Sequence, residues 1–236
     1  MPAHLISIIV PVFNEEATIV PVLMRLMAVD LPAKREIIVL NDGSNDATHA
    51  ALDAFDGRHP EVIVVHLPQN RGKGHAVRAG LARATGTVIA IQDADLELDP
   101  AQIGGLVEPI LRGDADVVYG SRFLTAPSGV SANRLGNAAL TWATNVLYGS
   151  SLTDMETCYK VMRGDIARRL RLTADRFEIE PEITAQLLLG GYRLVERPVT
   201  FSPRSRAAGK KIRWRDGFLA LRTLVRCRWA GSPRGQ

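Results

Sequence analysis

The chain has 236 residues, of which 46% are hydrophobic, with a mean hydropathy of +0.02 and a net charge of +4, so it can bury a substantial core and is not a disordered polar polypeptide. Its two cysteines, Cys158 and Cys227, match no metal-binding spacing and argue against a disulfide framework, which indicates a reducing compartment. No apolar run approaches the ~20 residues of a membrane-spanning helix and the N-terminus lacks a signal-peptide pattern, so we expect a cytoplasmic protein that can still lie at the cytoplasmic face of the membrane.

Strand and helix patterns alternate along the first half of the chain. Five short β-branched runs have the composition of strands buried on both faces: 5–10, 36–40, 62–65, 88–91 and 117–119. Helical patterns lie between them, at about 17–27, 47–55, 74–83 and 102–111. This alternation predicts an α/β fold with a Rossmann-like, mostly parallel sheet flanked by helices. In such sheets ligands bind outside the carboxyl ends of the strands.

A polar motif follows each of the five predicted strands. In chain order the motifs are Pro11-Val12-Phe13-Asn14-Glu15, Asn41-Asp42-Gly43-Ser44, Asn70-Arg71-Gly72-Lys73-Gly74, Asp93-Ala94-Asp95 and Gly120-Ser121-Arg122. Each alone has an ordinary explanation, such as a turn or the entry to a helix. Together they predict one ligand site along a single edge of the sheet.

The fourth motif belongs to a run of three carboxylates at alternate positions, Asp93, Asp95 and Glu97, directly after an apolar strand. Oxygen ligands at that density suit Mg²⁺ or Mn²⁺ better than a soft metal. Asp93 and Asp95 would point to opposite sides of a continued strand, so they converge on one ion only if the backbone bends there. A solvated turn is the alternative interpretation.

These five motifs, in this order, resemble the inverting nucleotide-sugar glycosyltransferases of family 2, which have the GT-A fold. Three further segments resemble the branch that makes polyprenyl-phosphate sugars, such as the dolichol-phosphate mannose and glucose synthases: Asp154-Met155-Glu156-Thr157-Cys158-Tyr159-Lys160, Phe177-Glu178-Ile179-Glu180-Pro181-Glu182 and Gly209-Lys210-Lys211-Ile212-Arg213-Trp214. The resemblance covers residues 6–222 approximately. It departs from the family pattern at Asn41, where an aspartate often stands, and at Glu97, where glutamine is frequent.

The resemblance implies a role for each motif. The base and ribose of a UDP- or GDP-sugar donor would contact Pro11, Phe13, Glu15 and Asp42. Asp93, Asp95 and Glu97 would ligate Mg²⁺ or Mn²⁺, which stabilises the leaving nucleoside diphosphate. The donor phosphates would be clamped by Arg71, Lys73 and Arg122. The segment 154–160 looks more like the glucose-transferring branch, which favours UDP-glucose over GDP-mannose.

A polyprenyl phosphate acceptor fits the charge of the chain. A phosphomonoester has a second pKa near ~6 and is already largely dianionic at neutral pH, so its attack needs no strong general base. The site instead needs positive charge for the acceptor phosphate, which we assign to Arg134, Arg204, Lys210 and Lys211. Together with Asp95 and Arg122, the arginines Arg134 and Arg204 are the predicted catalytic residues. Asp154, Glu180 and Glu182 would either order these cations, touch sugar hydroxyls, or form structural ion pairs.

The C-terminal part of the chain is strongly basic, since from Arg193 onward Glu196 and Asp216 are its acidic residues. Such a segment indicates contact with phosphates. Trp214, Phe218, Leu221 and Val225 recur at helical spacing beside arginines. This pattern predicts an amphipathic helix that either lies on anionic headgroups as a peripheral membrane contact or packs on the catalytic domain.

We therefore predict a GT-A catalytic domain over 1–212, with a nucleotide-sugar half at about 1–122 and an acceptor half at 123–212, and a basic amphipathic helix and tail over 213–236. The predicted activity is metal-dependent transfer of a hexose to a polyprenyl phosphate. The alternative is a soluble family 2 enzyme acting on a hydroxyl, with Asp154 as the base. A nucleotide-sugar pyrophosphorylase would carry a glycine-rich loop after the first strand, and an RNA-binding protein a recognisable RNA motif, so nucleic acid is not an expected partner.

Overall fold

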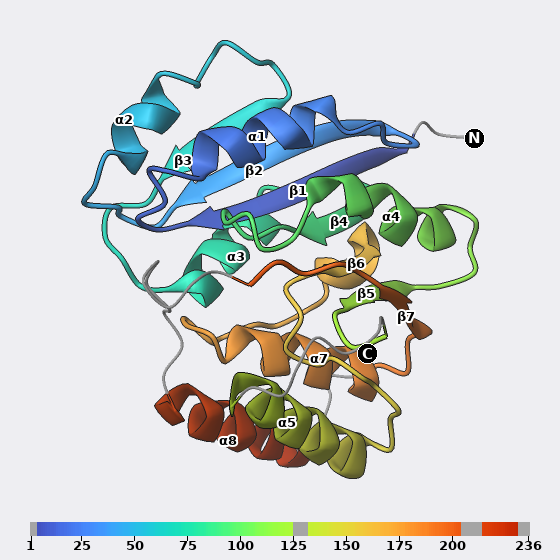
Figure 1. Cartoon of the computed structure of the whole chain (residues 1–236). Helices are drawn as coiled ribbons and strands as arrows, with labels where there is room; N and C mark the ends of the chain where they lie inside the picture. Colours follow the sequence, from blue (N-terminus) through green and yellow to red (C-terminus); the bar gives the residue numbers. More distant parts are fainter. Residues whose placement is uncertain (1–3, 125–131, 204–213, 231–236) are drawn as a thin grey trace.

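The computed structural model describes residues 4–124, 132–203 and 214–230. Within them, one sheet lies between layers of helices (Figure 1). Its strands are β1 (Leu5–Val12), β2 (Lys34–Asn41), β3 (Val62–His66), β4 (Val88–Ile91), β5 (Val117–Ser121), β6 (Lys160–Arg163) and β7 (Leu194–Pro198). The helices are α1 (Ile19–Ala28), α2 (Thr48–Asp53), α3 (Lys73–Leu81), the 3₁₀ turn η1 (Pro100–Gln102), α4 (Ile103–Leu111), α5 (Ala132–Tyr148), α6 (Gly164–Ala167), α7 (Ile179–Leu189) and α8 (Trp214–Ala230).

The sheet has the strand order β3-β2-β1-β4-β6-β5-β7. Neighbouring strands are parallel except β6, which runs antiparallel to both β4 and β5. The predicted mostly parallel sheet and its five predicted strands are thus confirmed. The antiparallel strand β6 brings the segment before Lys160 to the carboxyl ends of β4 and β5, which is the predicted ligand edge.

The central strands are apolar because helices cover both faces of the sheet. Helices α1 and α4 lie on one side, and α3 and α7 lie on the other (Figure 1). Helix α3 approaches β1 closely at Gly80, where a Cβ atom would stand 2.5 Å from the Ile9 side chain. The buried strand residues and the inward faces of these helices form one hydrophobic core. This core holds the loops at the carboxyl edge in fixed positions.

Helices α5 and α8 form an outer pair that packs on α7 (Figure 1). Leu224 of α8 and Met155 form part of a second, smaller core with Leu152 and Ala185. Predicted helix α8 is confirmed, but the face that packs is not the predicted stripe, because Phe218 is 67% exposed. The side chain of Trp214 lies outside the described residues. In the described part of the chain, no helix combines the length and the apolarity needed to cross a bilayer.

Candidate functional site

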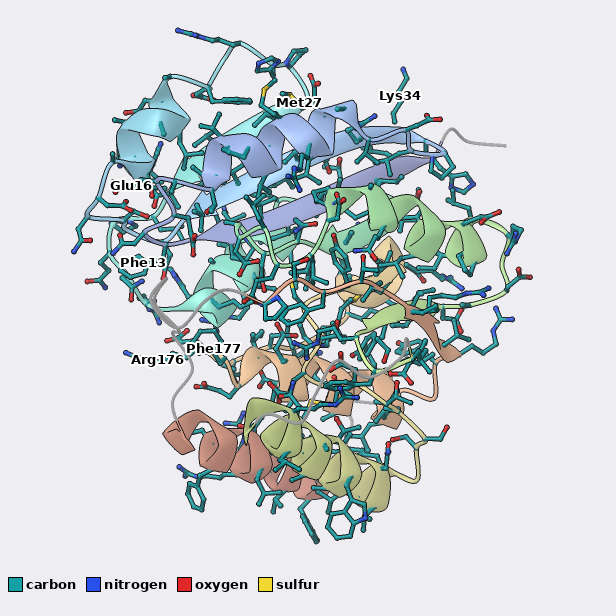
Figure 2. The ribbon with its side chains drawn as sticks, viewed as in Figure 1. Phe13, Glu16, Met27, Lys34, Arg176 and Phe177 are labelled. Carbon is teal, nitrogen blue, oxygen red and sulfur yellow. The ribbon has the colours of Figure 1, made fainter. Side chains whose placement is uncertain are left out.

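The loops after β1 and β2 are bonded to each other at the carboxyl edge of the sheet. Ser44 Oγ accepts the backbone N–H of Asn14 at 3.0 Å, and Thr48 Oγ1 accepts that of Glu15 at 2.8 Å. Asn14 has a φ of 53°, a left-handed conformation that asparagine adopts more readily than most residues. Figure 2 shows Phe13, in this loop, on the same edge of the molecule as the segment that precedes α7. Two predicted base-contacting residues, Phe13 and Glu15, are therefore held on a braced loop.

Asp42, which is also predicted to contact the base or ribose, anchors the loop that follows β3. Its carboxylate is almost fully buried and accepts the backbone N–H groups of Arg71 at 3.0 Å and Gly72 at 2.6 Å. The side chain of Asn70 donates to it at 3.0 Å. Hydrogen bonds to a carboxylate are stronger than those between neutral groups. The contact between Asp42 and a nucleotide base stays a prediction.

Asp42→Ala is expected to lower the free energy of unfolding by about 1–3 kcal/mol, because partly buried donors of the 70–72 loop lose their acceptor. Urea unfolding measures this loss. Asp56→Ala, at an exposed aspartate, is the control and should change stability by less than about 0.5 kcal/mol. Equal stability of the two variants would contradict the anchoring role.

Asn41, where the resembled family often has aspartate, is used as a donor. Its Nδ2 group donates to His66 Nδ1 at 2.9 Å, while its Oδ1 accepts the N–H of Ser44 at 3.0 Å. Because His66 accepts at Nδ1, its Nε2 carries the proton and faces Asp53 at 3.2 Å. His49, Asp53 and His66 bring ligand atoms within 4.8 Å of one another, but this tautomer of His66 offers a metal no lone pair.

The backbone bends over residues 94–97, as convergence of the acidic motif requires. Asp95 Oδ1 accepts the N–H of Glu97 at 3.1 Å within this bend. Asp93 Oδ1 accepts from the Lys73 ammonium at 2.7 Å. Although burial opposes the charged form of each, this ion pair lowers the pKa of Asp93 and raises that of Lys73 well above its ordinary value. Lys73, a predicted phosphate ligand, is thus bound to a predicted metal ligand.

A chain of buried ion pairs continues from Lys73 into α7 and β6. Lys73 Nζ also lies 2.8 Å from Glu180 Oε1, and Glu180 Oε2 lies 2.5 Å from Lys160 Nζ. Lys160 is fully buried and donates further to the carbonyl oxygens of Met155 and Thr157. Glu180 therefore orders two lysines. The sequence predicts no role for Lys160, whose one signal is its place at the end of the 154–160 motif.

Arg122 and Asp154 form a bidentate ion pair. Both distances, Nε to Oδ2 and Nη2 to Oδ1, are 2.7 Å, and the Arg122 backbone N–H also donates to Asp154. Asp154 is fully buried, and its carboxylate raises the pKa of Arg122 against the opposing effect of burial. This carboxylate, the predicted base of the alternative function, is committed to a guanidinium.

The other predicted residues lie at separate positions. Arg134, at the start of α5, lies 5.1 Å from the centroid of the Phe123 ring, and Arg122 lies 5.6 Å from the same centroid. Glu182 accepts the N–H groups of Thr173 and Ala174, so it holds the segment before α7. Arg71 pairs with Asp175, and Pro11 is buried within β1. Arg204, Lys210 and Lys211 lie outside the described residues.

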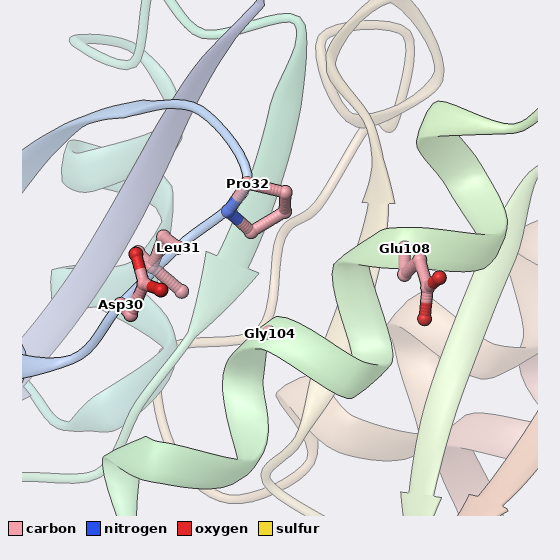
Figure 3. Close-up of a pocket in the computed structure, with 5 residues that line it drawn as sticks. All are labelled: Asp30, Leu31, Pro32, Gly104 and Glu108. Atoms are coloured by element: carbon pink, nitrogen blue, oxygen red, sulfur yellow. The ribbon is translucent and has the colours of Figure 1, made fainter.

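A surface pocket of about 320 Å³ lies away from these residues (Figure 3). It is lined by Asp30, Leu31, Pro32, Gly104 and Glu108, between the loop after α1 and helix α4. None of these five residues belongs to the polar motifs, so this pocket is not part of the candidate site.

Solved structures with the same fold have bound nucleotides and metals. Glucosyl-3-phosphoglycerate synthase from Mycobacterium tuberculosis, in complex with Mn²⁺, uridine diphosphate and phosphoglyceric acid, superposes with a TM-score of 0.71 at 19% identity over 98% of this chain and 80% of that one. Another structure of the same enzyme contains Mg²⁺ and uridine diphosphate. This likeness confirms the predicted GT-A fold.

Curated relatives match most of the chain. The dodecaprenyl-phosphate galacturonate synthase of Rhizobium johnstonii is 29% identical over 87% of this chain and 61% of its own length. The dolichol-phosphate mannosyltransferase of Pyrococcus furiosus is 27% identical over 96% of this chain and 65% of its own. This chain thus spans less than two thirds of either relative. The profile of glycosyl transferase family 2 matches residues 7–170, more than half of the chain, which therefore belongs to that family.

Proposed function

We propose that this protein transfers a hexose, with inversion, from a UDP- or GDP-sugar to a polyprenyl phosphate, assisted by Mg²⁺ or Mn²⁺. The observation that carries the proposal is the position of Arg122 and Arg134 around one ring, that of Phe123. Arg122 directly follows β5 at the carboxyl edge of the sheet. Arg134 lies in the first turn of α5, which is one of the two outer helices. Two guanidinium groups at this junction suit two phosphate-bearing substrates.

The acidic motif fits a hard divalent cation. Asp93 directly precedes the bend and Asp95 lies within it, so both can offer carboxylate oxygens. Mg²⁺ is commonly held by one or two carboxylates together with substrate phosphates. When bound, the ion would supply positive charge to the leaving diphosphate. Lys73 would keep its contact with Glu180 as Asp93 turns to the ion.

The acceptor chemistry favours a phosphate over an alcohol. An alcohol needs a base, and the carboxylate predicted for that task, Asp154, is bound through both oxygens to Arg122. A phosphate dianion needs orientation and positive charge instead. The bound phosphoglyceric acid of the structural neighbour nevertheless makes a phosphorylated metabolite the second acceptor class to test.

The outer helices support a peripheral contact with a bilayer. Large apolar side chains are exposed along both of them: Leu135, Trp142 and Val146 on α5, and Phe218, Leu221, Val225 and Trp229 on α8. Exposed arginines, including Arg222, flank these side chains on α8. Basic residues beside large apolar ones suit an anionic lipid surface, where a polyprenyl phosphate resides.

A matrix assay tests the proposal. The protein is incubated with Mg²⁺ or Mn²⁺ and with UDP-glucose, UDP-N-acetylglucosamine or GDP-mannose, each with a short polyprenyl phosphate, with 3-phosphoglycerate or with no acceptor. Release of nucleoside diphosphate that requires the polyprenyl phosphate would support the proposal and name the sugar. Release that requires 3-phosphoglycerate would overturn the lipid acceptor and leave a glycosyltransferase with a soluble substrate.

Replacing Trp142 and Trp229 by glutamate is expected to weaken binding to vesicles containing phosphatidylglycerol by at least about tenfold, since burying one large apolar side chain contributes roughly 1.5–3 kcal/mol. Both side chains are exposed, at 68% and 73%, so folding should be unaffected. Met24→Glu is the control, because Met24 is 53% exposed on α1. Cosedimentation measures binding, and equal retention of all variants would contradict a role of the outer helices.

A further inference from the structure

One carboxylate oxygen at the candidate site has no hydrogen-bond partner among the described residues. Glu156 lies in the segment that enters β6, beside the carboxyl ends of β4 and β5. Its Oε1 atom is buried, and among the described residues it accepts no hydrogen bond. An unsatisfied buried polar atom costs about 1–3 kcal/mol, so native proteins keep few of them outside ligand sites.

The cations around Glu156 are paired with other carboxylates. The ammonium group of Lys160 has three hydrogens and three acceptors, namely Glu180 and two backbone carbonyl oxygens. Arg122 gives two hydrogen bonds to Asp154. Among the described residues, the unused oxygen in this part of the network is therefore an acceptor, which carries negative charge when Glu156 is ionised. It is complementary to a ligand group that donates a hydrogen bond.

The position of Glu156 relates it to the donor sugar. Asp93, a predicted metal ligand, connects to Lys160 through the ion pairs of Lys73 and Glu180. In the proposed reaction, the metal ion holds the diphosphate and the sugar is attached to that diphosphate. Glu156 interacts electrostatically with Lys160 and Arg122 and so belongs to the same network, and a sugar bound there would present hydroxyl donors.

Building on the proposed function, we propose that Glu156 is a specificity-determining residue that accepts a hydrogen bond from a hydroxyl of the transferred sugar and selects a neutral hexose over a hexuronate. A hydroxyl group satisfies the buried oxygen. A uronate would instead bring a second carboxylate against it, and like charges at close range cost several kcal/mol. The selection comes from this repulsion as much as from the hydrogen bond.

The selection should depend on pH. The pKa of Glu156 is raised to about 7, mainly by burial and also by Glu180 and Asp154, against the lowering effect of Lys160 and Arg122. Below that pKa the protonated side chain can donate to a uronate, whereas above it the ionised side chain repels one. Discrimination against the uronate is therefore expected to increase as pH rises from about 6 to about 8.

The test compares the wild type with Glu156→Gln, which keeps the shape and removes the charge. Calorimetric titration in the presence of Mn²⁺ measures the affinity for UDP, for UDP-glucose against UDP-glucuronate and for UDP-galactose against UDP-galacturonate. If the protein binds GDP rather than UDP, the affinities for GDP-mannose and GDP-mannuronate are compared instead. Glu108→Gln, at an exposed glutamate on α4, is the matched control.

At about pH 8 the wild type should bind the neutral member at least about tenfold more tightly, and Glu156→Gln should reduce this ratio to less than about threefold. Affinity for the bare nucleotide and the melting temperature should not change. An unchanged ratio in Glu156→Gln, or a wild type that prefers the uronate, overturns this assignment and leaves the proposed function standing. If no nucleotide or nucleotide sugar binds the wild type, the proposed function fails and this assignment with it.

Discussion

Asp95→Ala is expected to lower the rate of sugar transfer by at least about a thousandfold while the protein stays folded. Asp95 lies in the bend after β4, where its carboxylate would bind the ion that stabilises the leaving diphosphate. Loss of that stabilisation removes several kcal/mol of transition-state binding, and each ~1.4 kcal/mol changes the rate tenfold. The rate of nucleoside diphosphate release at saturating Mn²⁺ measures the effect.

Asp114→Ala provides the control for this prediction, because Asp114 is 61% exposed and pairs with Arg112 after α4. Its rate should equal that of the wild type. Titration of Mn²⁺ by electron paramagnetic resonance gives a second readout, in which Asp95→Ala should bind the ion more weakly. Full transfer activity of Asp95→Ala would show that the acidic motif does not hold the ion.

Lys160→Met should cost about 3–5 kcal/mol of stability, the range found when one partner of a buried ion pair is removed. The fully buried ammonium of Lys160 satisfies Glu180 and two carbonyl oxygens, and a thioether can replace none of these bonds. For a domain of this size the melting temperature should fall by about 6–20 °C. Thermal and urea unfolding measure the loss.

Lys34→Met, at an exposed lysine that opens β2, is the matched control and should be within about 0.5 kcal/mol of the wild type. Adding Glu180→Gln to Lys160→Met should cost less than the sum of the single changes, because the two side chains touch. If Lys160→Met lowered the free energy of unfolding by less than about 1 kcal/mol, the ion pair between Lys160 and Glu180 would not stabilise the fold as predicted.

The elements that could be predicted are those with a strong local pattern. Strands β1 to β5 are runs of β-branched residues, and their order with the intervening helices determines a parallel sheet. Strand β6 is not predicted from the sequence, because two of its four residues are the charged Lys160 and Arg163, which are typical of an exposed polar segment. Lys160 is compatible with a buried strand because Glu180, twenty positions later in α7, neutralises it. A local pattern contains no sign of such a partner.

Prediction of the site was limited for the same reason. The motifs meet at one edge as expected, because the carboxyl ends of parallel strands lie together. Residue type alone, however, does not distinguish a carboxylate that binds a ligand from one that anchors a loop. Asp42 holds the 70–72 loop and Asp154 holds Arg122, whereas Glu156 keeps an unused oxygen. Each distinction depends on contacts between distant segments.

The position of β6 also determines how the chain can be divided. A fragment ending at Arg122 would contain β4 and β5 but not the strand that lies between them. Its β4 would have an open edge, and β5, which also pairs with β7, would have no neighbour at all. Open edges of apolar strands pair with other molecules and aggregate. Dissection of the nucleotide-sugar half for expression, or a split-protein reassembly, should therefore keep the segment through β7 on the same polypeptide as β4 and β5.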